Sequence, residues 1–479
     1  MRREVFRFTE YTMILTATDL ERIDASSVRI LGELGLRVDD AALREAAIRA
    51  GAAPGDKADW IRIPPEMVRD CVAMAPSQVT FAGAGGGATT VAPGGTSTFW
   101  TGAALNYVDG AACRSITGSD LRDFCRLADR MEHLMAVVGT SVAEAPPPVR
   151  DVAGLAIMAA HTRKHLRPLL FSPDSVPAMI EIAQVVADGA SLAERPLISF
   201  GYSCLPPLHW AATSTELWRR SSRHALPLML NGEPITGTTS PVTLAGSLAL
   251  AHAEVLGGVV LVQLLEPGRP VIHNVGFAHS VDMRTAACLS GTPECALLAA
   301  AGAALAAHHG LPSASWMCTD AFTDDEQASL EKMLTGMAHA DAGVNVIWGM
   351  GQLESEKTLS PVQLVIDNDL AGMLRRWRSG IVVNDDTLAF DVIRDVVEGR
   401  GDFLSHDHTL NHFRTALSES PLMTRTHRDT WQAAGAATLA RRARAQVDAI
   451  LAEPAVPVLR GDQLAAIAAI RDKAFSRLK

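Results

Sequence analysis

The stretch Ser313-Ala-Ser-Trp-Met-Cys-Thr-Asp-Ala-Phe-Thr-Asp-Asp-Glu-Gln-Ala-Ser-Leu-Glu-Lys332 predicts a strand, a polar turn and a helix in direct succession. Residues 313–318 follow an apolar segment and include a tryptophan and a methionine, which is typical of a half-buried strand. In such a strand Ala314, Trp316 and Cys318 share one face, because side chains alternate between the two faces. Strand ends that lead into polar loops are where α/β barrels carry their chemistry.

The second half of this stretch predicts a capped helix. Thr319 and Asp320 supply turn-forming side chains. Thr323 followed by Glu326 is a capping-box pattern, in which a hydroxyl and a carboxylate bind the free N–H groups of the first turn. One apolar stripe at helical spacing follows, made of Leu330, Met333, Leu334, Met337 and Ala338.

The same unit of apolar run, polar loop and helix recurs from about residue 119 onward. The candidate strands are residues 133–141, 168–172, 197–202, 227–231, 270–275, 313–318 and 344–349, with 380–383 as the best candidate for an eighth. Several predicted helices open on a hydroxyl residue followed by proline, which joins a capping side chain to a residue suited to the first turn. These pairs are Ser172-Pro173, Ser240-Pro241, Thr292-Pro293 and Ser360-Pro361.

Repeats of strand and helix predict an α/β fold with a parallel sheet, and a closed TIM (β/α)8 barrel is the commonest solution at this length. We expect the barrel to occupy residues 119–385. Residues 1–118 are expected to add helices and a glycine-rich β-hairpin segment packed on the barrel, and residues 386–479 a helical extension. The glycine-rich piece lacks the lysine and the G-x-G-x-x-G helix entry of a phosphate-binding loop.

The composition is that of an ordinary globular enzyme. Of the 479 residues, 48% are hydrophobic and 20% are charged, which argues against disorder. The net charge of −10 argues against nucleic acid or an anionic membrane as a partner, and we see no membrane span. The seven cysteines include no C-x-x-C pair, and the charged amino terminus does not resemble a signal peptide. We therefore expect a cytoplasmic protein with reduced thiols.

Polar and aromatic side chains cluster where the predicted strands end. The predicted substrate-binding residues are Trp100, Tyr202, Trp210, Asn231, Asn274, Phe277, Trp316 and Trp348. Four of them are tryptophans, which favours an aromatic box around a quaternary ammonium, where each ring face contributes roughly 0.5–2 kcal/mol. Packing in the barrel core is the alternative for any single ring.

Cys318, Asp320 and Glu354 are the predicted catalytic residues. Asp320 and Glu354 have the chemistry of a general acid and base, with loop binding and helix capping as the alternative role. Cys318 has no histidine partner visible in the sequence, so a thiol that lines the substrate site is the safer role. The His-x-His-x3-His pattern at 406–412 has a spacing compatible with a metal, but it matches no known zinc pattern.

Short motifs between about residues 20 and 455 carry a resemblance to a known family. They are Gly237-Thr-Thr-Ser-Pro-Val-Thr-Leu-Ala-Gly246, Ala253-Glu-Val-Leu256, residues 263–268, Gly291-Thr-Pro-Glu294, Thr319-Asp-Ala321, Asp325-Glu-Gln-Ala328, Glu331-Lys332, Gly349-Met-Gly-Gln-Leu-Glu354, Gln363-Leu-Val-Ile-Asp367 and His408-Thr409. With these motifs the chain resembles the trimethylamine methyltransferase family of corrinoid-dependent methyltransferases. The resemblance implies a TIM barrel that passes a methyl group from a methylated amine to a Co(I) corrinoid carried by a partner protein.

One departure from the family pattern bears on the substrate. The founding members carry pyrrolysine immediately before a Ser-Asp-Ala segment, where this chain has Cys318 before Thr319-Asp-Ala321. Two residues earlier, where those proteins have a small residue, this chain has Trp316. It therefore resembles the non-pyrrolysine branch, some members of which demethylate glycine betaine.

The predicted function is methyl transfer from a small quaternary amine, similar to glycine betaine, to the corrinoid (cobalamin) of a carrier protein, without pyrrolysine. The predicted cofactor-binding residues are Gly237, Thr238, Gly349 and Gly351, since glycine lets the backbone approach a cofactor closely. Two alternatives remain: zinc-dependent methyl transfer involving a thiol or alcohol, with His406, His408, His412 and Cys318 as ligands, and a non-catalytic betaine-binding protein. We also expect a homo-oligomer.

Overall fold

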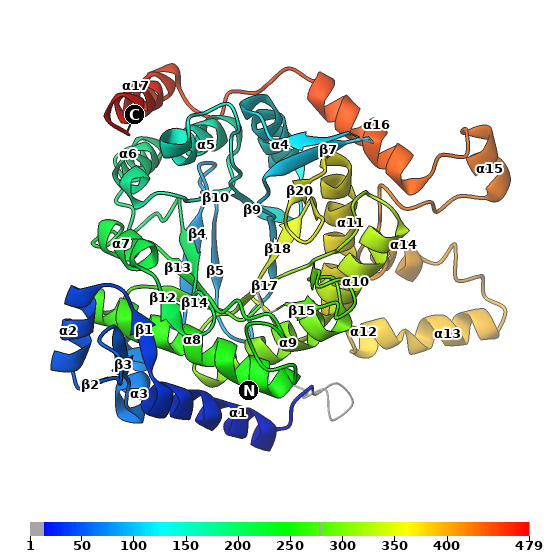
Figure 1. Cartoon of the computed structure of the whole chain (residues 1–479). Coiled ribbons are helices and arrows are strands. Elements are labelled where there is room, and N and C mark those ends of the chain that lie inside the picture. The colour runs from blue at the N-terminus through cyan, green and yellow to red at the C-terminus, as the bar shows by residue number, and fades with distance from the viewer. Residues whose placement is uncertain (1–13, 111, 277–278, 479) are drawn as a thin grey trace.

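The computed structural model describes residues 14–110, 112–276 and 279–478. Parallel strands lie at the centre of the molecule, and helices are arranged around them (Figure 1). Eight strands form this centre: β6 (Thr98–Thr101), β9 (Leu134–Val138), β10 (His165–Arg167), β11 (Phe200–Ser203), β13 (Leu228–Asn231), β14 (Val271–Asn274), β17 (Ala314–Trp316) and β18 (Val346–Met350).

The central strands pair in parallel in two ladders, β10–β9–β6–β18–β17 and β11–β13–β14. Single parallel bridges, Leu166 to Ile198 and His273 to Ser313, link the two ladders at both edges. Parallel strands joined by helical crossovers all end on the same side of the sheet. The predicted α/β class is therefore confirmed, and the carboxyl ends of all these strands lie together.

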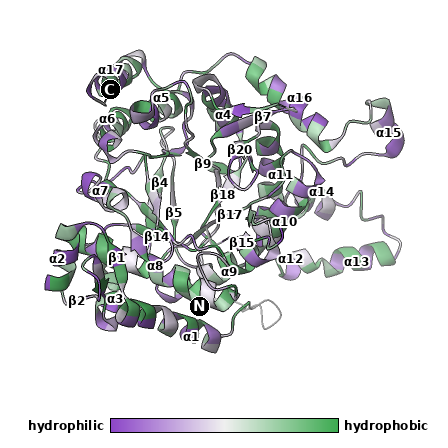
Figure 2. Ribbon diagram, viewed as in Figure 1, coloured by the Kyte–Doolittle hydropathy of each residue, from purple (hydrophilic) through white to green (hydrophobic). Residues whose placement is uncertain are grey.

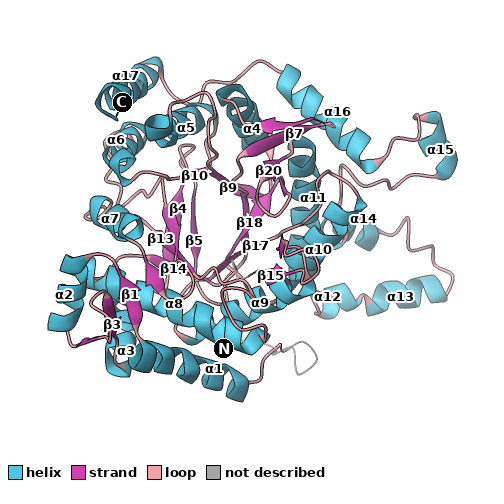
Figure 3. Cartoon of the chain, in the orientation of Figure 1, coloured by secondary structure: helices cyan, strands magenta, loops and turns pink. Residues whose placement is uncertain are grey.

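A helix follows each central strand and packs outside it (Figure 3). These helices are α4 (Gly118–Arg130), α5 (Arg150–His161), α6 (Val176–Ala187), α7 (Ala212–Arg220), α8 (Leu244–Leu265), α9 (Pro293–His308), α10 (Glu326–Asp341) and α11 (Pro361–Arg378). Thr292 and Ser360 cap α9 and α11 ahead of a proline, as predicted. The pair Ser240-Pro241 does not begin a helix, because α8 starts only after Thr243.

The amino-terminal segment forms a small layer against α8. It contains α1 (Ala17–Arg29), η1 (Ile30–Leu34), β1 (Leu36–Val38), α2 (Ala41–Arg49), β2 (Ala53–Pro54), β3 (Trp60–Arg62) and α3 (Pro65–Met74). Strand β1 pairs with β3 and also with β12 (His209–Trp210), a short strand from the loop after β11. These pairings attach the amino-terminal layer to the main α/β unit.

A hairpin of β4 (Val79–Ala82) and β5 (Ala88–Val91) fills the amino-terminal end of the central strands. The ring of Phe81 meets Trp100 edge-on, with 4.9 Å between centroids. Ala82 N donates a hydrogen bond to Pro196 O, ahead of β11, over 3.0 Å. This end of the strand bundle is therefore closed by apolar and aromatic side chains.

Helix α8 is apolar all round. It has 22 residues and a window of mean hydropathy 1.9, so it is long and apolar enough to cross a membrane. Yet 83% of that window is buried inside the fold, where α8 lies between the central strands and α1 to α3. Burial on all sides accounts for its composition, because only a helix without a solvent-facing side needs no polar stripe.

The carboxyl-terminal segment has two parts. An arm of α12 (Asp385–Leu388), α13 (Phe390–Val397), α14 (Asp407–Ala416) and α15 (Arg428–Ala433) extends to one side of the molecule (Figure 1). Beyond it, α16 (Leu439–Ala452) packs on α11 and α4, and α17 (Gly461–Leu478) packs on α6 and α5. The arm exposes many apolar side chains, visible as green segments along α13 (Figure 2).

Loops between the main elements carry short structures. They are β7 (Asn106–Asp109), β8 (Ala112–Ser115), η2 (Pro147–Val149), η3 (Pro173–Ser175), β15 (Ser280–Val281), β16 (Cys288–Leu289), β19 (Gln352–Leu353) and β20 (Thr358–Leu359).

Three strand predictions differ from the structure. The first central strand is β6, inside the segment 1–118 that was assigned to the amino-terminal additions, and it pairs with both β9 and β18. Residues 380–383 form no strand and are exposed, because the apolar run there connects α11 to the arm. Strand β10 precedes the predicted run 168–172 by three residues. The polar side chains His165 and Arg167 hid this strand from an apolar count.

The helix of the opening stretch also differs in detail. Asp325 caps α10, and its carboxylate accepts from the N–H of Ala328, so the Thr323–Glu326 capping box is wrong. The predicted apolar stripe is only partly buried: Leu330 is 72% exposed, whereas Met333 and Met337 pack against the core. The buried side instead carries Lys332, which donates to the carboxylate of Asp367 over 2.7 Å. The fully buried face of α10 thus includes a paired charge, whereas the hydrophobic pattern predicted that Leu330 and Leu334 would be buried.

Candidate functional site

Charged and aromatic side chains converge at the carboxyl ends of the central strands. Arg167, Asn231, Asn274, Trp316 and Trp348 belong to the strands, and Glu233, His279 and Glu356 to the loops that follow them. We call these eight residues the mouth. It faces away from the β4–β5 hairpin, which fills the opposite end.

Two tryptophans form a corner in the mouth. Trp316 and Trp348 are Cα partners on β17 and β18, with ring centroids 5.5 Å apart and planes at 84°. The guanidinium of Arg167 lies over the ring of Trp348, 4.7 Å from its centroid. The predicted neighbourhood of Trp316 and Trp348 is therefore found, but a protein cation already covers one face of Trp348.

Arg167 is a buried cation with little to neutralise it. Its Nε has no hydrogen-bond partner among the described residues, and Glu233 and Glu356 act on it only as more distant charges. Burial lowers the pKa of Arg167 to about 10. A Cβ on Gly201 would lie 2.3 Å from Nη2, so the glycine makes room for the guanidinium. Such a group can bind a carboxylate with two parallel hydrogen bonds.

An acidic pair lies in the same mouth. Burial raises the pKa of Glu233 to about 7, and the charge of Glu356 adds to the rise. Glu356 Oε1 lies 3.3 Å from His279 Nε2. Burial lowers the pKa of His279, but Glu356 outweighs it and the net shift is upward. His279 is therefore paired with Glu356, whereas Glu233 changes its charge near neutral pH.

A line of amides joins β11, β13 and β14. Asn274 Nδ2 donates to Asn231 Oδ1 over 3.0 Å, and Asn231 Nδ2 donates to Ser203 Oγ over 3.3 Å. The N–H of Gly276 donates to Asn274 Oδ1 over 2.9 Å. Asn231 and Asn274 are thus brought together as predicted, and their hydrogen bonds fix the strand ends around Arg167.

The predicted catalytic residues occupy separate surroundings. Burial raises the pKa of Cys318, so the thiol stays protonated, and its Sγ lies 3.6 Å from Trp316 O. Asp320 accepts hydrogen bonds from the N–H groups of Ser290 and Gly291, over 2.9 and 3.0 Å. These contacts bind one loop to another, which is the alternative that the sequence left open for this carboxylate.

Glu354 lies in the loop after β18, and its carboxylate accepts from Thr358 Oγ1 over 2.6 Å. Within the described residues no hydrogen bond joins Glu354 to Asp320. An acid–base pair of these two carboxylates therefore has no support in their contacts.

Three predicted binding residues lie elsewhere. Trp100 packs on Phe81 at the hairpin end. Trp210 belongs to β12 and lies in the layer around α8. Its ring centroid is 4.8 Å from that of Trp218. Tyr202 faces the helices, because its neighbour Gly201 faces Arg167 and side chains alternate along a strand. Phe277 lies outside the described residues.

The four predicted cofactor residues divide into two kinds. Gly349 and Gly351 have φ of +103° and +78° and are buried, and a Cβ on Gly349 would lie 2.5 Å from Met317 O. Their conformation and close packing explain these glycines without a cofactor. Gly237 and Thr238 are exposed in the loop after β13, on the side of the mouth.

The histidine pattern of the arm is only partly assembled. His408 and His412 approach Asp386, with His412 Nε2 3.1 Å from the aspartate Oδ2. His406 instead caps α14, and Cys318 is buried beside β17. Among the described residues, the proposed group of three histidines and one cysteine is therefore not brought together.

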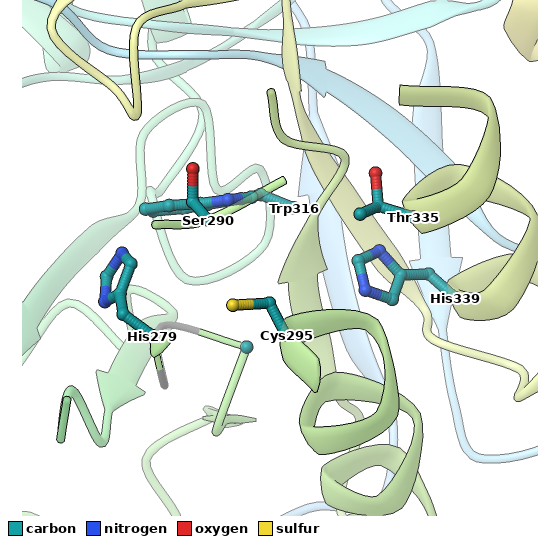
Figure 4. Close-up of a pocket in the computed structure, with 7 residues that line it drawn as sticks. His279, Ser290, Cys295, Trp316, Thr335 and His339 are labelled. Carbon is teal, nitrogen blue, oxygen red and sulfur yellow. The ribbon is translucent and has the colours of Figure 1, made fainter. Parts of the chain in front are cut away.

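A narrow cavity adjoins Trp316. The space between its walls is too tight for a water molecule. Figure 4 shows the Trp316 ring edge-on above Cys295, with His279 and His339 on either side. Burial lowers the pKa of His339 to about 3, so this ring is neutral. The residues that line this cavity lie around Trp316, and the cavity has no space for a substrate.

Sequence reasoning missed the charged half of the mouth. Arg167, Glu233, His279 and Glu356 were absent from the predicted site, although Glu233 and His279 closely follow the predicted strands 227–231 and 270–275. The signal for Arg167 was the alternation of His165, Leu166 and Arg167, a strand pattern with a polar inner face. Glu356 has φ of +80° in an irregular loop, which no pattern indicates.

Comparison with known sequences gives one consistent set. A family model described as trimethylamine methyltransferase (MTTB) matches residues 2–475. The trimethylamine methyltransferase MttB of Desulfitobacterium hafniense is 32% identical over 443 residues, 90% of this chain and 88% of the relative. MttB of Methanosarcina barkeri is 30% identical over 96% of this chain and 95% of its own. A glycine betaine methyltransferase of D. hafniense is also 30% identical, over 93% and 94% of the two chains.

Solved structures show a likeness of fold. The hydroxylamine complex of MtmB matches with a TM-score of 0.55 at 10% identity, over 98% of this chain and 89% of that one. The monomethylamine methyltransferase MtmB of M. barkeri gives 0.54 at 11% identity, over 95% and 86%.

Proposed function

Because this chain belongs to the trimethylamine methyltransferase family, we propose that it transfers a methyl group from a small quaternary amine with a carboxylate, such as glycine betaine, to the Co(I) of a corrinoid on a partner protein. The observation that carries the proposal is Arg167, a buried cation without a hydrogen-bond partner for its Nε among the described residues. Trimethylamine offers nothing to an arginine, whereas a betaine offers a carboxylate.

The proposal places the reaction at the mouth of a closed (β/α)8 barrel. The pairing of β18 with β6 and the single bridges between the two ladders support a closed ring. In such barrels catalytic groups come from the carboxyl ends of several strands. Arg167, Asn231, Trp316 and Trp348 come from four different strands of this chain.

The charges of the mouth suit a zwitterion. Arg167 provides a positive site against the face of Trp348. Glu233 and Glu356 provide negative charge, and Trp316 adds an aromatic surface next to His279, with ring centroids 5.5 Å apart. A betaine binds with its carboxylate on Arg167 and its ammonium toward Trp316 and the acidic pair. Charge complementarity of this kind fixes orientation, which is catalysis by positioning.

The reaction asks little acid–base chemistry of the chain. When a methyl group leaves a quaternary ammonium, the nitrogen keeps the bonding electron pair and departs as a neutral tertiary amine. No proton has to be delivered, so the reaction does not need a general acid. It can therefore proceed although Cys318 is protonated and Asp320 is bound to a neighbouring loop. The chain has to remove water from the cation and aim one methyl group outward, toward the acceptor.

The surface around the mouth fits a flat apolar acceptor on a carrier protein. Loops after six central strands each expose an apolar side chain: Leu105, Phe171, Leu205, Val242, Met283 and Phe322. Exposed apolar surface of this kind marks interaction sites. The exposed Gly237 and Thr238 lie in one of these loops and are the residues proposed to approach the corrinoid. The corrinoid supplies the Co(I) nucleophile that accepts the methyl group.

A binding panel tests the substrate class. We expect titration calorimetry to detect glycine betaine, whereas choline and tetramethylammonium, which have the cation without the carboxylate, bind at least tenfold more weakly. Equal affinity for all three ligands would mean that Arg167 does not bind the carboxylate. Preference for trimethylamine over glycine betaine would contradict the proposed substrate.

The proposal includes a homo-oligomer. Val397 and Leu404 of the arm and Ile381 just before it are 77%, 87% and 89% exposed, and such side chains are normally covered by a partner. A second copy of the chain is the proposed partner. Light scattering should give a mass above that of one chain, and a chain in which Val397 and Leu404 are changed to serine should be smaller. A monomeric wild-type protein would contradict this.

A further inference from the structure

Three side chains from three helices converge outside the central strands. Asp24 lies on α1, His252 within α8, and His309 directly after α9. Asp24 Oδ1 is 3.1 Å from His252 Nε2 and 2.7 Å from His309 Nε2. His308 Nε2 lies 4.0 Å from the other carboxylate oxygen. Three helices far apart in sequence thus present one oxygen and several ring nitrogens to a common point.

These groups are of the kinds that hold a transition-metal ion. Imidazole nitrogens and a carboxylate oxygen are common ligands of zinc in proteins. The ligand atoms of Asp24, His252 and His309 all lie within 4.8 Å of one another. One ion can therefore contact all three side chains.

A second histidine supports the first. His252 Nδ1 lies 2.7 Å from His273 Nε2, and both rings are fully or almost fully buried. A metal-binding histidine usually donates its other ring N–H to a neighbouring acceptor, which fixes the ring orientation. His273 provides such an acceptor for Nδ1 and leaves Nε2 of His252 aimed at Asp24.

The cluster is open to solvent on one side. Asp24, His308 and His309 line a groove of about 920 Å³ between α1, α3 and the end of α9. An ion can therefore reach Asp24 and His309 although His252 is buried. The site is separate from the mouth: His273 lies on the outer face of β14, whereas its neighbour Asn274 faces inward to Asn231.

We propose that Asp24, His252 and His309 bind one divalent transition-metal ion of the zinc type, with His308 or water as the fourth ligand. Tetrahedral zinc holds its nitrogen and oxygen ligands about 2.0 Å away, so these atoms lie on the order of 3.3 Å apart. The present separations of 2.7 and 3.1 Å need only small side-chain rotations to reach that spacing. The ion would fasten α1 to α8 and α9 and so hold the amino-terminal layer in place.

Metal binding by the full-length chain tests the proposal. Protein stripped with a chelator and dialysed would be titrated with Zn²⁺, and with Co²⁺ for its visible absorption. We expect one tightly bound equivalent, a tetrahedral Co²⁺ spectrum and a rise in melting temperature on addition of Zn²⁺. His309→Gln, at the edge of the groove, should weaken binding by at least about 100-fold, because a direct ligand matters more than a supporting one.

Two controls locate the ion. The double variant His408→Gln, His412→Gln removes the exposed group on the arm and should bind Zn²⁺ as the wild type does. Asp24→Asn keeps the size of the side chain and should abolish the Co²⁺ spectrum. No bound equivalent in the wild type would overturn the proposal and leave a hydrogen-bond network. Binding that survives in His309→Gln but is lost in the double arm variant would overturn it as well.

Discussion

Two buried arginines differ in how fully the rest of the chain satisfies their hydrogen bonds. Arg269 lies in the layer of α7 and α8 and donates to Leu226 O and Trp218 O, over 3.1 and 2.9 Å, and to Ser221 Oγ over 2.8 Å. Arg167 lies in the mouth, where its Nε has no hydrogen-bond partner among the described residues. Burial lowers both pKa values to about 10.

The contrast teaches that burial alone does not mark a functional charge. A buried cation costs free energy unless hydrogen bonds and opposite charge offset that cost. Arg269 has these partners within the chain, and Arg167 has Trp348 and little else. Glu233 and Glu356 offset part of the cost of burying Arg167, and under the proposed function a bound carboxylate would offset more of it.

The largest expected effect is on stability. Arg269→Met leaves two carbonyls without their donor and should lower the free energy of unfolding by about 3–5 kcal/mol. Arg167→Met removes an unpaired charge and should leave stability unchanged or raise it. Urea denaturation of both variants measures this difference. Equal losses in the two variants would mean that Arg167 has partners in solution and would end the comparison.

In a binding experiment the order of the two effects should be reversed: the Arg167 variant should lose affinity and the Arg269 variant should not. Arg167→Met removes a bidentate contact to the carboxylate and should weaken glycine betaine binding by about 3 kcal/mol, roughly 100-fold. Arg269→Met, measured where it is still folded, should bind like the wild type. Calorimetry at one temperature suffices, and unchanged affinity in Arg167→Met would refute the assignment.

Two tryptophans extend the comparison. Trp316→Ala should weaken betaine binding by roughly 1–3 kcal/mol, since both a ring face and packing are lost. Trp210→Ala, in the α7–α8 layer, should leave affinity unchanged but lower the unfolding free energy by about 3–5 kcal/mol. If Trp316→Ala binds betaine normally with its fold intact, this ring is not part of the site.

The smallest expected effect is a pH dependence. Glu233 has a pKa of about 7, so it is neutral below that pH and anionic above it. Affinity for the cation should therefore rise from about pH 6 to 8, by roughly 1 kcal/mol. Without ligand, the raised pKa makes stability fall as pH rises from the unfolded value of the carboxyl through about 7.

Glu233→Gln is the matched variant for this pH series. It keeps the size of the side chain and should remove most of the slope in affinity. Arg167, His279 and Glu356 face the same space and remain titratable, so a slope that persists in Glu233→Gln would assign the effect to the pair of His279 and Glu356.

The sequence predicted the order of strands and helices far better than it predicted the mouth. Strand β13 opens with three apolar residues, Leu228 to Leu230, and hydroxyl–proline pairs begin α9 and α11, so local signals were sufficient there. Strand β6 was assigned to the wrong segment, because its pairing with β18 joins residues far apart in sequence. Long-range pairing is not visible in local periodicity.

The site was harder for a related reason. Trp100, Trp210, Trp316 and Trp348 are alike in sequence, yet only the last two share the mouth. Which way a side chain points depends on strand register, and a displacement of three residues hid Arg167. Loop carboxylates such as Glu356 are positioned by irregular backbone, for which no periodic signal exists.

Methyl transfer itself tests the central claim most directly. Full-length protein would be mixed with Co(I) cobalamin, free or on a carrier protein, and either glycine betaine or trimethylamine, and the Co(I) absorption followed. We expect glycine betaine to discharge the Co(I) absorption with one equivalent of dimethylglycine formed, and trimethylamine to leave it unchanged. Turnover of trimethylamine alone, or tight binding of glycine betaine without any loss of Co(I), would contradict the claim.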